Sequence, residues 1–497
     1  MNPFYILLRK SLLLLLFVSG MTLFSCSGNN TPPNILLILV DDMGYGDPAC
    51  YNSASKIPTP VIDQLAADGM RFTDAHATGP LCHPSRYGLI TGRYPFRTDL
   101  SVWRKQATIE ANRPTIASFL KSTGYHTAMV GKWHLGFNEK GYDQPLRGGP
   151  YDRGFDSFFG IRASTDIPPY FYIRDDRAVE PPTDSIAASS SGGWSPIQGA
   201  FWRAGGIAPG LELEDVLPRF TEEATQVIEA HAADADNEKP LMLYLAYPAP
   251  HTPWLPSAEF EGTSDAGMYG DFMAMVDAHI GRMLAALQRN GMAENTMVIF
   301  TSDNGPVWYD EDVERFGHDA AGGFRGMKGD AWEAGHRMPF IVKWPGKVAP
   351  GTVNGHTICF TDLFATLAEI TGQPIPEGGA PDSYSFLPQL TGTKKKSDPR
   401  PPVVLESAGG AMMIRSGNWK YIDQLGSGGF SKPRRIEPGP GDPEGQLYDL
   451  AADPYELNNL YMEKPAIVDM LKSELQEIIE DRPAGPYTDI PAEVEDM

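Results

Sequence analysis

Cysteine is scarce in this chain: only four of its 497 residues are cysteines. A framework of several disulfides is therefore excluded, and burial of apolar side chains must supply the stability, which a chain of this length can do. Cys50 and Cys359 could pair in an oxidising compartment, or they could be two small buried thiols. The sequence leaves both possibilities open.

Positive charge is also in short supply. Lysine and arginine number 41 against 63 aspartates and glutamates, which gives a formal net charge of -22. Such a surface excludes non-specific binding to nucleic acid or to an anionic membrane leaflet. An anionic substrate would be repelled at long range, so its site must be a local pocket of arginine and lysine.

The N-terminus lacks a hydrophobic run of the roughly 20 apolar residues that span a membrane. Arg9 and Lys10 precede a shorter apolar run, Leu12 to Val18, and the segment LFSCSG follows at 23–28. This order resembles a bacterial lipoprotein signal, in which residues 1–25 are removed and Cys26 carries the lipid. We therefore expect an exported bacterial lipoprotein, in the periplasm or at the outer membrane or cell surface, that meets the membrane only through this lipid. A plain secretory signal or a membrane anchor is the alternative.

Apolar segments alternate with segments of helical spacing along most of the chain. Asn34 to Val40 is continuously apolar, as expected for a strand buried on both faces of a sheet. Pro60 and Gly69 frame one helical segment, and Pro114 and Gly124 frame another, because proline favours helix starts and glycine favours helix ends. Further strands are predicted over 127–130, 240–246 and 297–301, and a further helix over 272–287. This alternation predicts an α/β fold whose functional residues gather at the carboxyl ends of the strands.

Two stretches interrupt this pattern. The segment 181–209 is rich in Ser, Gly and Pro, which predicts a long irregular insertion. The polar stretch around Lys394 to Lys396 predicts a boundary between a catalytic domain over 34–395, preceded by a linker at 26–33, and a subdomain over 396–497. Within the subdomain, a hairpin is predicted over 412–422 and an amphipathic helix over 467–479.

Carboxylates directly follow two of the predicted strands. Asp41 and Asp42 come after the first apolar strand, and Asp303 and Asn304 come after the strand at 297–301. Their oxygen atoms could meet at one edge of the sheet, and such hard ligands suit Ca²⁺ or Mg²⁺ better than zinc. For a single aspartate at a strand end, capping of the next helix or turn is the alternative role.

One cysteine lies beside a cation in the segment Pro80 to Arg86, which reads PLCHPSR. Pro84 disfavours an earlier helix start, and a helix that begins at Pro84 would place Arg86 about one turn from Cys82. A guanidinium group in this position could hold developing negative charge. Taken alone, the cysteine could also be a buried, inert thiol.

The pattern C-x-P-S-R at Cys82 to Arg86 resembles the signature of the formylglycine-dependent sulfatases, the type I, arylsulfatase-like branch of the alkaline phosphatase superfamily. The run GYHTAMVGKWH over 124–134 resembles the second signature of that family, and 446–460 resembles its C-terminal segment. His83 departs from the pattern, because a small residue is usual there. The resemblance implies a large, mostly parallel mixed sheet sandwiched by helices, with a small C-terminal α+β subdomain that contains an antiparallel sheet.

The resemblance also implies roles for individual residues. Cys82 would be oxidised to formylglycine (3-oxoalanine) by a formylglycine-generating or anaerobic sulfatase-maturating enzyme, and its hydrate would attack the sulfur of a sulfate ester. The catalytic set would be Cys82, Arg86, Lys132, His134, His251 and Lys328. One Ca²⁺ would be held by Asp41, Asp42, Cys82, Asp303 and Asn304. Substrate contacts would come from Ser164, Arg325, His336 and Trp254, for which ordinary packing or a plain loop position is the alternative.

These roles imply a sulfatase, a sulfuric ester hydrolase, that acts on a sulfated polysaccharide or oligosaccharide. A formylglycine-dependent hydrolase of phosphonates or phosphodiesters is the nearest alternative. The two-zinc phosphatases of the superfamily are disfavoured, because their sites resemble Asp-His where this chain has Asp303-Asn304. A lipoprotein that binds sulfated glycans without turnover is the alternative from another functional class.

Overall fold

The computed structural model describes residues 32–234, 238–393 and 400–481. The predicted signal over 1–25, Cys26 and the predicted domain boundary at 395–396 lie outside these residues. Within the described part of the chain, no helix combines the length and the apolar character needed to cross a membrane.

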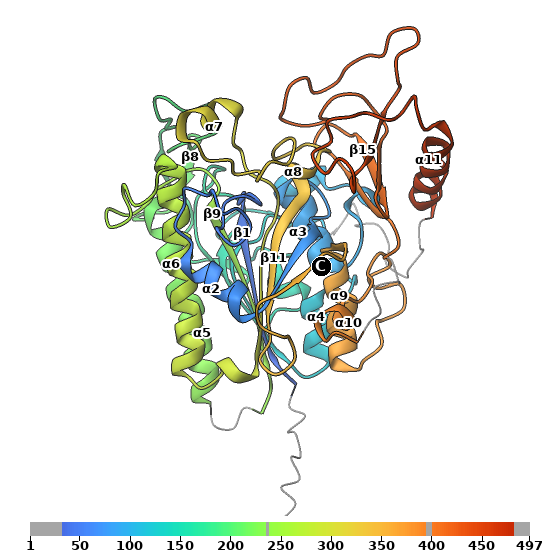
Figure 1. The fold of residues 1–497 in the computed structure, drawn as a ribbon. Coiled ribbons are helices and arrows are strands. Elements are labelled where there is room, and N and C mark those ends of the chain that lie inside the picture. The colour runs from blue at the N-terminus through green and yellow to red at the C-terminus, as the bar shows by residue number, and fades with distance from the viewer. Residues whose placement is uncertain (1–31, 235–237, 394–399, 482–497) are drawn as a thin grey trace, which may run out of the picture. The chain divides into compact units, whose positions relative to one another are not determined.

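One sheet of eleven strands carries the fold from Pro33 onward (Figure 1). Its strands follow the order β12-β2-β11-β10-β1-β9-β3-β4-β5-β6, and β13 pairs with β2. The five strands from β10 to β4 are parallel to one another, whereas β11 runs antiparallel to both β10 and β2. The bounds are β1 (Asn34–Asp41), β2 (Met70–His76), β3 (His126–Lys132), β4 (Ser157–Ile161), β5 (Ile173–Arg174), β6 (Arg177–Ala178), β9 (Leu241–Pro250), β10 (Thr296–Ser302), β11 (Arg337–Lys343), β12 (Thr352–Asn354) and β13 (Ile358–Cys359).

Helices cover both faces of this sheet (Figure 1). One face carries α2 (Pro60–Asp68), α5 (Val216–Ala233) and α6 (Gly267–Arg289), and the other carries α3 (Cys82–Thr91), α4 (Ile116–Ser122), α9 (Asp362–Thr371) and α10 (Leu387–Leu390). Successive residues of β1 therefore enter two different cores: Leu36 and Ile38 join one buried cluster, and Leu37 and Leu39 join the other. The predicted α/β class is confirmed, and the double coverage explains why β1 is apolar throughout.

The predicted insertion over 181–209 contains one small antiparallel pair, β7 (Asp184–Ile186) with β8 (Gly205–Ile207), and is otherwise irregular. The remaining short elements among the described residues before the C-terminal sheet are two helices, α7 (Asp310–Phe316) and α8 (Glu333–His336), and five 3₁₀ turns. These turns are Pro95–Arg97, Ser101–Arg104, Pro150–Arg153, Leu213–Asp215 and Ala293–Asn295.

A second, four-stranded antiparallel sheet lies near the C-terminus. Its strands are β14 (Val403–Glu406), β15 (Met412–Ser416), β16 (Trp419–Ile422) and β17 (Gln446–Asp449). The hairpin predicted over 412–422 is confirmed as β15 and β16. The predicted helix is α11 (Pro465–Glu480), which packs on these strands through Val468, Leu471 and Leu475.

A buried charge network joins the small sheet to the large one. Lys420 on β16 is fully buried and pairs with Glu333 at 3.0 Å and Glu456 at 2.8 Å. Arg415 on β15 pairs with Asp74 on β2 at 2.6 Å. The buried charge network consists of Asp74, His76, Glu333, His336, Arg337, Arg415, Lys420 and Glu456. The contact between the two sheets is thus electrostatic as well as apolar.

Cys50 and Cys359 are free thiols, which decides between the two possibilities left open by the sequence. Burial raises the pKa of Cys50 to about 12 and that of Cys359 to about 11. Both thiols therefore stay protonated and unreactive at physiological pH.

Candidate active site

Two acidic pairs meet at the carboxyl ends of β1 and β10. These strands are parallel neighbours, with Val40 opposite Ser302, so the residues that follow them emerge side by side. The backbone N–H of Asp42 donates to Asp303 Oδ1 at 3.3 Å, and Asn304 Nδ2 donates to Asp42 Oδ1 at 2.6 Å. All four side chains that the sequence proposed as metal ligands from these strands are buried and lie together.

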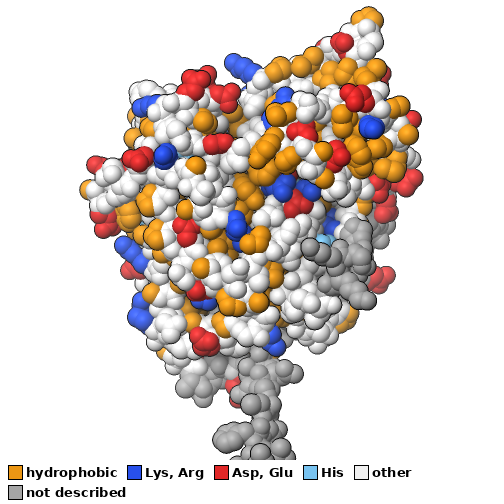
Figure 2. Space-filling model, viewed as in Figure 1, with side chains coloured by type: hydrophobic (Ala, Val, Ile, Leu, Met, Phe, Trp, Pro, Cys, Tyr) orange, Lys and Arg blue, Asp and Glu red, His pale blue; other side chains and the backbone are white. Residues whose placement is uncertain are grey.

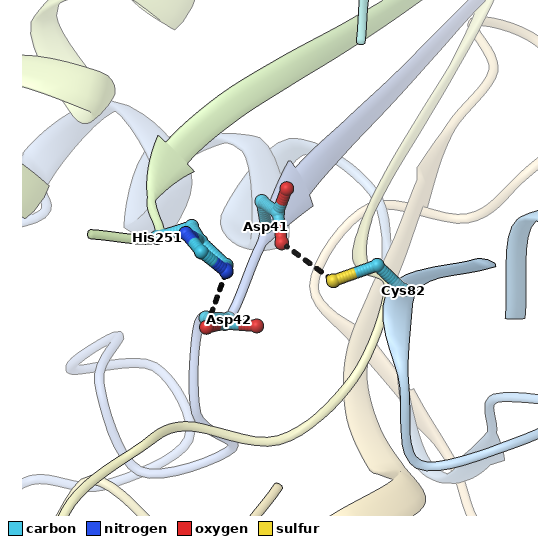
Figure 3. Close-up of side chains that lie close together, drawn as sticks. All are labelled: Asp41, Asp42, Cys82 and His251. Carbon is cyan, nitrogen blue, oxygen red and sulfur yellow. Dashed lines mark hydrogen bonds and ion pairs between the residues drawn. The ribbon is translucent and has the colours of Figure 1, made fainter. Parts of the chain in front are cut away.

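Cys82 reaches this cluster from the first residue of α3 (Figure 3). Its Sγ lies 3.2 Å from Asp41 Oδ1. The helix begins at Cys82, so the expected start at Pro84 is wrong by two residues. Proline is tolerated there because the first-turn N–H groups have no partner within the helix. Arg86 still falls one turn from Cys82, as predicted.

Two buried cations, Arg86 and Lys132, pair with these carboxylates. Arg86 Nε donates to Asp303 Oδ2 at 2.9 Å, and its Nη2 lies 3.3 Å from Asp41 Oδ2. Lys132, the last residue of β3, pairs with the same oxygen of Asp41. Burial alone would raise the pKa of Asp41, but Lys132, His251 and Arg86 bring it well below its usual value. Asp41 is therefore a permanent anion.

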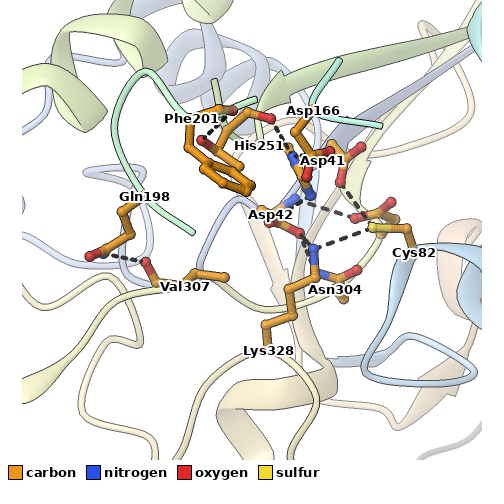
Figure 4. Close-up of polar contacts among 12 residues, drawn as sticks. Asp41, Asp42, Cys82, Asp166, Gln198, Phe201, His251, Asn304, Val307 and Lys328 are labelled. Carbon is orange, nitrogen blue, oxygen red and sulfur yellow. Dashed lines mark hydrogen bonds and ion pairs between the residues drawn. The ribbon is translucent and has the colours of Figure 1, made fainter. Parts of the chain in front are cut away.

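Lys328 and His251 both lie next to Asp42, one on each side of it in Figure 4. Lys328 Nζ contacts Asp42 Oδ1 and lies 3.4 Å from Cys82 Sγ. His251 Nε2 lies 3.7 Å from Asp42 Oδ2, and its Nδ1 donates to the carbonyl of Thr252 at 2.6 Å. That donation places the proton of a neutral imidazole on Nδ1, so Nε2 faces the cluster as the exchangeable nitrogen.

The Cys82 thiol is held in its neutral form. Burial, Asp303 and Asp41 raise its pKa well above the usual value, and Lys132 and Lys328 only partly oppose them. A neutral thiol is a poor nucleophile. The surroundings of Cys82 are thus arranged for something other than thiolate chemistry.

His134 follows β3 and has no hydrogen-bond partner for either ring nitrogen among the described residues. The side chain is 4% exposed, its ring meets Trp103 edge-on at 4.4 Å, and His83 lies 5.6 Å away, centre to centre. Burial and the nearby Lys132 lower the pKa of His134 well below its usual value, so the ring is neutral and can accept a proton. Buried polar atoms without partners are rare, and they often mark places where a ligand binds.

The loop after β4 contributes two further polar side chains. Ser164, which the sequence proposed, is buried with its hydroxyl unpaired among the described residues. Asp166 lies beside His251, with a distance of 3.9 Å between Asp166 Oδ1 and His251 Nδ1 (Figure 4). Asp166 was not among the residues predicted from the sequence. Its position just past the end of a parallel strand is the signal that could have found it.

Three proposed substrate contacts are packed elsewhere instead. Trp254 is 3% exposed in a cluster of aromatic rings with Tyr269 and Trp308. His336 is fully buried in the charge network and accepts from Lys420 at 3.2 Å. The Arg325 guanidinium stacks on Trp332 at 3.7 Å and donates to the carbonyl of Glu456 at 2.8 Å. The packing alternative therefore holds for these side chains, because their polar or aromatic groups are already used inside the protein.

The donor set fits a hard divalent cation. One ligand atom from each of Asp41, Asp42, Cys82 and His251 lies within 4.8 Å of the others, and Asn304 Oδ1 is buried without a hydrogen-bond partner in the described structure. An unpaired amide oxygen beside several carboxylates matches the oxygen ligands that Ca²⁺ takes. The residues predicted to hold Ca²⁺ are thus compatible with it.

Comparison with known proteins decides the family. The family model described as Sulfatase matches residues 33–373. The chain belongs to the sulfatase family. It is 36% identical to an N-acetylgalactosamine-6-O-sulfatase of Bacteroides thetaiotaomicron, over 91% of this chain and 94% of that protein, and 34% identical to human arylsulfatase A, over 86% and 83%.

A solved Bacteroides thetaiotaomicron structure, from work on the metabolism of multiple glycosaminoglycans, shares the fold of this sulfatase with a TM-score of 0.79. It is 33% identical and aligns over 90% of this chain and 99% of its own. The predicted family and fold are confirmed, and the chain is an enzyme that hydrolyses sulfate esters.

Acidic and basic side chains are interspersed on the face drawn in Figure 2. Arg86, Lys132 and Lys328, by contrast, are buried and form a local cluster of positive charge around Asp41 and Asp42.

Proposed function

We propose that this sulfatase removes sulfate from a sulfated carbohydrate by means of a formylglycine made from Cys82. The observation that carries the proposal is the position of Cys82, whose buried side chain lies between the Asp41 carboxylate and the Lys328 ammonium group, with Arg86 one turn away. This placement puts the reacting atom where cations can hold the sulfate and where a metal can be bound. The similarity to an N-acetylgalactosamine-6-O-sulfatase supports a 6-O-sulfated amino sugar as the first substrate to test.

Formylglycine would supply a hydrated aldehyde as nucleophile, and Ca²⁺ would supply a Lewis acid that polarises a sulfate oxygen. Asp41, Asp42, Asp303 and Asn304 would hold the metal together with residue 82. The guanidinium of Arg86 and the ammonium groups of Lys132 and Lys328 stabilise the negative charge on the sulfate oxygens.

Two imidazoles would move the protons. His251 presents Nε2 to the cluster while Nδ1 is fixed by Thr252, so a proton on Nε2 can be given to the leaving sugar oxygen. His134 is neutral, buried and unpaired at both ring nitrogens among the described residues, so it can accept the proton whose loss restores the aldehyde.

Sulfate release from defined sugars tests the proposed function. Protein co-expressed with a formylglycine-generating enzyme is incubated with N-acetylgalactosamine-6-sulfate, its 4-sulfate isomer, N-acetylglucosamine-6-sulfate and a phenylphosphonate monoester. We expect kcat/KM for the first substrate to exceed that for each of the others by about tenfold or more, a difference of ~1.4 kcal/mol. Faster turnover of the phosphonate would favour the hydrolase of phosphonates or phosphodiesters, and no turnover with intact binding would favour the glycan-binding protein.

Removal of the metal is expected to abolish turnover and to lower stability. A cation that binds only the folded chain adds its binding free energy to the stability, so chelation should lower the urea midpoint, and Ca²⁺ should restore it better than Mg²⁺. Calorimetric titration of a Cys82→Ser protein measures Ca²⁺ affinity without any reaction. We expect Asn304→Ala to weaken that affinity about tenfold or more, because one oxygen ligand is lost. The exposed Asn458→Ala serves as control, and equal affinities in both variants would contradict the assignment.

We also propose that the protein is exported with a lipid on Cys26. The segment at 1–28 supports this, as described above. Such a location would bring the enzyme to sulfated glycans outside the cytoplasm and would leave conversion of Cys82 to a maturation enzyme that acts before export.

A further inference from the structure

Asp166 is a buried carboxylate with one free oxygen beside the catalytic cluster. The residue is 4% exposed and follows β4 in the loop that also holds Ser164. Its Oδ1 has no hydrogen-bond partner among the described residues. Buried acceptors without a partner are rare and costly, so an oxygen of this kind calls for a partner that the described residues do not provide.

The other oxygen of Asp166 is fixed by the insertion over 181–209. Arg203, on this insertion, pairs through Nη1 with Asp166 Oδ2 and donates from the same nitrogen to the Asp166 carbonyl at 3.2 Å. The guanidinium also stacks over the ring of Phe201 at 5.0 Å. The carbonyl of Gly199 accepts from Thr252, the residue next to His251, at 2.8 Å. The insertion thus locks Asp166 in one orientation and ties that orientation to the catalytic histidine.

His251 does not satisfy the free oxygen. Its Nδ1 donates to the carbonyl of Thr252 at 2.6 Å, which leaves no second proton on that nitrogen for Asp166 Oδ1 at 3.9 Å. Figure 4 shows Asp166 and His251 side by side above the cluster of Asp41, Asp42 and Cys82. Asp166 Oδ1 therefore lies next to the imidazole that would donate a proton to the leaving sugar oxygen.

We propose that Asp166 is a specificity-determining residue that accepts a hydrogen bond from a hydroxyl group of the sugar ring that carries the sulfate. This inference rests on the proposed function and names the group that the site recognises: a pyranose hydroxyl close to the sulfated carbon. A substrate without such a donor leaves a buried carboxylate oxygen unpaired, and sites of this kind reject such substrates strongly. The insertion is then a recognition element, because Arg203 sets the direction of the acceptor.

The test compares Asp166→Asn with wild type on two sulfate esters. One is N-acetylgalactosamine-6-sulfate, which has ring hydroxyls, and the other is 4-nitrophenyl sulfate, which has none. We expect the ratio of kcat/KM for the sugar to kcat/KM for the aryl ester to fall by about 10–150-fold, the range for a hydrogen bond to a charged group. A second measurement, calorimetry in a Cys82→Ser background, should show a similar loss of sugar affinity. Asp176→Asn is the matched control, because the Asp176 carboxylate forms a surface pair with Arg147 at 3.3 Å, and this variant should leave the ratio within twofold.

The outcomes separate this inference from the proposed function. If wild type turns over the sugar and the ratio is unchanged in Asp166→Asn, the inference is wrong and the proposed function stands. An equal loss on both esters would also overturn it, since it would mean that Asp166 only positions His251. If no sugar sulfate is turned over but sugar binding still depends on Asp166, the proposed function fails and the inference holds. Wild type that neither binds nor turns over the sugar counts against both.

Discussion

Protein in which Cys82 remains a thiol is expected to release sulfate at least ~10³-fold more slowly than protein in which Cys82 is converted to formylglycine. A sulfur nucleophile would hold the transferred sulfate but has no second hydroxyl group whose deprotonation could expel it. Each molecule could then react once at most. Proton acceptance by His134 becomes useful only when position 82 carries a hydrated aldehyde, so the defect should lie in turnover and not in substrate binding.

The measurement pairs the mass of the tryptic peptide containing residue 82 with kcat, for protein made with and without the maturation enzyme. Cys82→Ser gives the unreactive reference, and Cys359→Ser, which changes a buried thiol in β13, gives the control with full activity. Equal kcat for the thiol and converted forms would contradict the formylglycine mechanism. If the wild-type thiol resists conversion and a His83→Ala variant is converted, the imidazole next to Cys82 is the cause.

Lys420→Met is expected to destabilise the fold by about 3–5 kcal/mol, the cost of leaving buried charges unpaired. Lys420 is fully buried between Glu333 and Glu456, at 3.0 and 2.8 Å, and methionine fills a similar volume without the charge. Lys343→Met is the matched control, because Lys343 forms a half-exposed pair with Asp68 that should be worth about 1 kcal/mol or less. Urea unfolding of both variants measures the difference, and equal losses would show that the network contributes no more than a surface pair.

The loss in Lys420→Met should grow with pH. Burial raises the pKa of Glu456 to about 7, although Lys420 lowers it. The folded chain therefore binds the Glu456 proton more tightly than the unfolded chain, whose pKa is near 4.5. This difference stabilises the folded chain fully below pH 4.5, and the stabilisation is lost as the pH rises toward 7. Without Lys420 the folded pKa rises further, and the decline continues past pH 7. We therefore expect Lys420→Met to lose more free energy of unfolding at pH 8 than at pH 5. A loss independent of pH would contradict the raised pKa of Glu456.

The sequence predicted that four of the proposed metal ligands would lie together, because each of these four stands at the end of a strand. Asp41, Asp42, Asp303 and Asn304 needed only the rule that parallel strands end at one edge of the sheet. The start of α3 was misplaced because the pattern around Pro84 allows a helix to begin at any of several first-turn positions. The motif at 82–86 was nevertheless sufficient to place Arg86 one turn from Cys82.

The sequence does not reveal contacts between residues that lie far apart along the chain. Asp166 is recognisable only with its partner Arg203, which comes from an insertion without regular spacing. His336 was proposed as a substrate contact, whereas its burial depends on Lys420 and His76, which lie far away in the chain. Pairings of this kind are set by how the two sheets pack, and no local pattern encodes them.

The buried charge network also bears on how this protein could have been assembled in evolution. Asp74 on β2 and Glu333 at the start of α8 find their cations, Arg415 and Lys420, on the small sheet. Recombination that exchanged the C-terminal sheet for that of a relative would succeed only if the incoming strands carried both cations in the same places. The two sheets should therefore be inherited as one unit, and substitutions on either side of their contact should be matched by changes on the other.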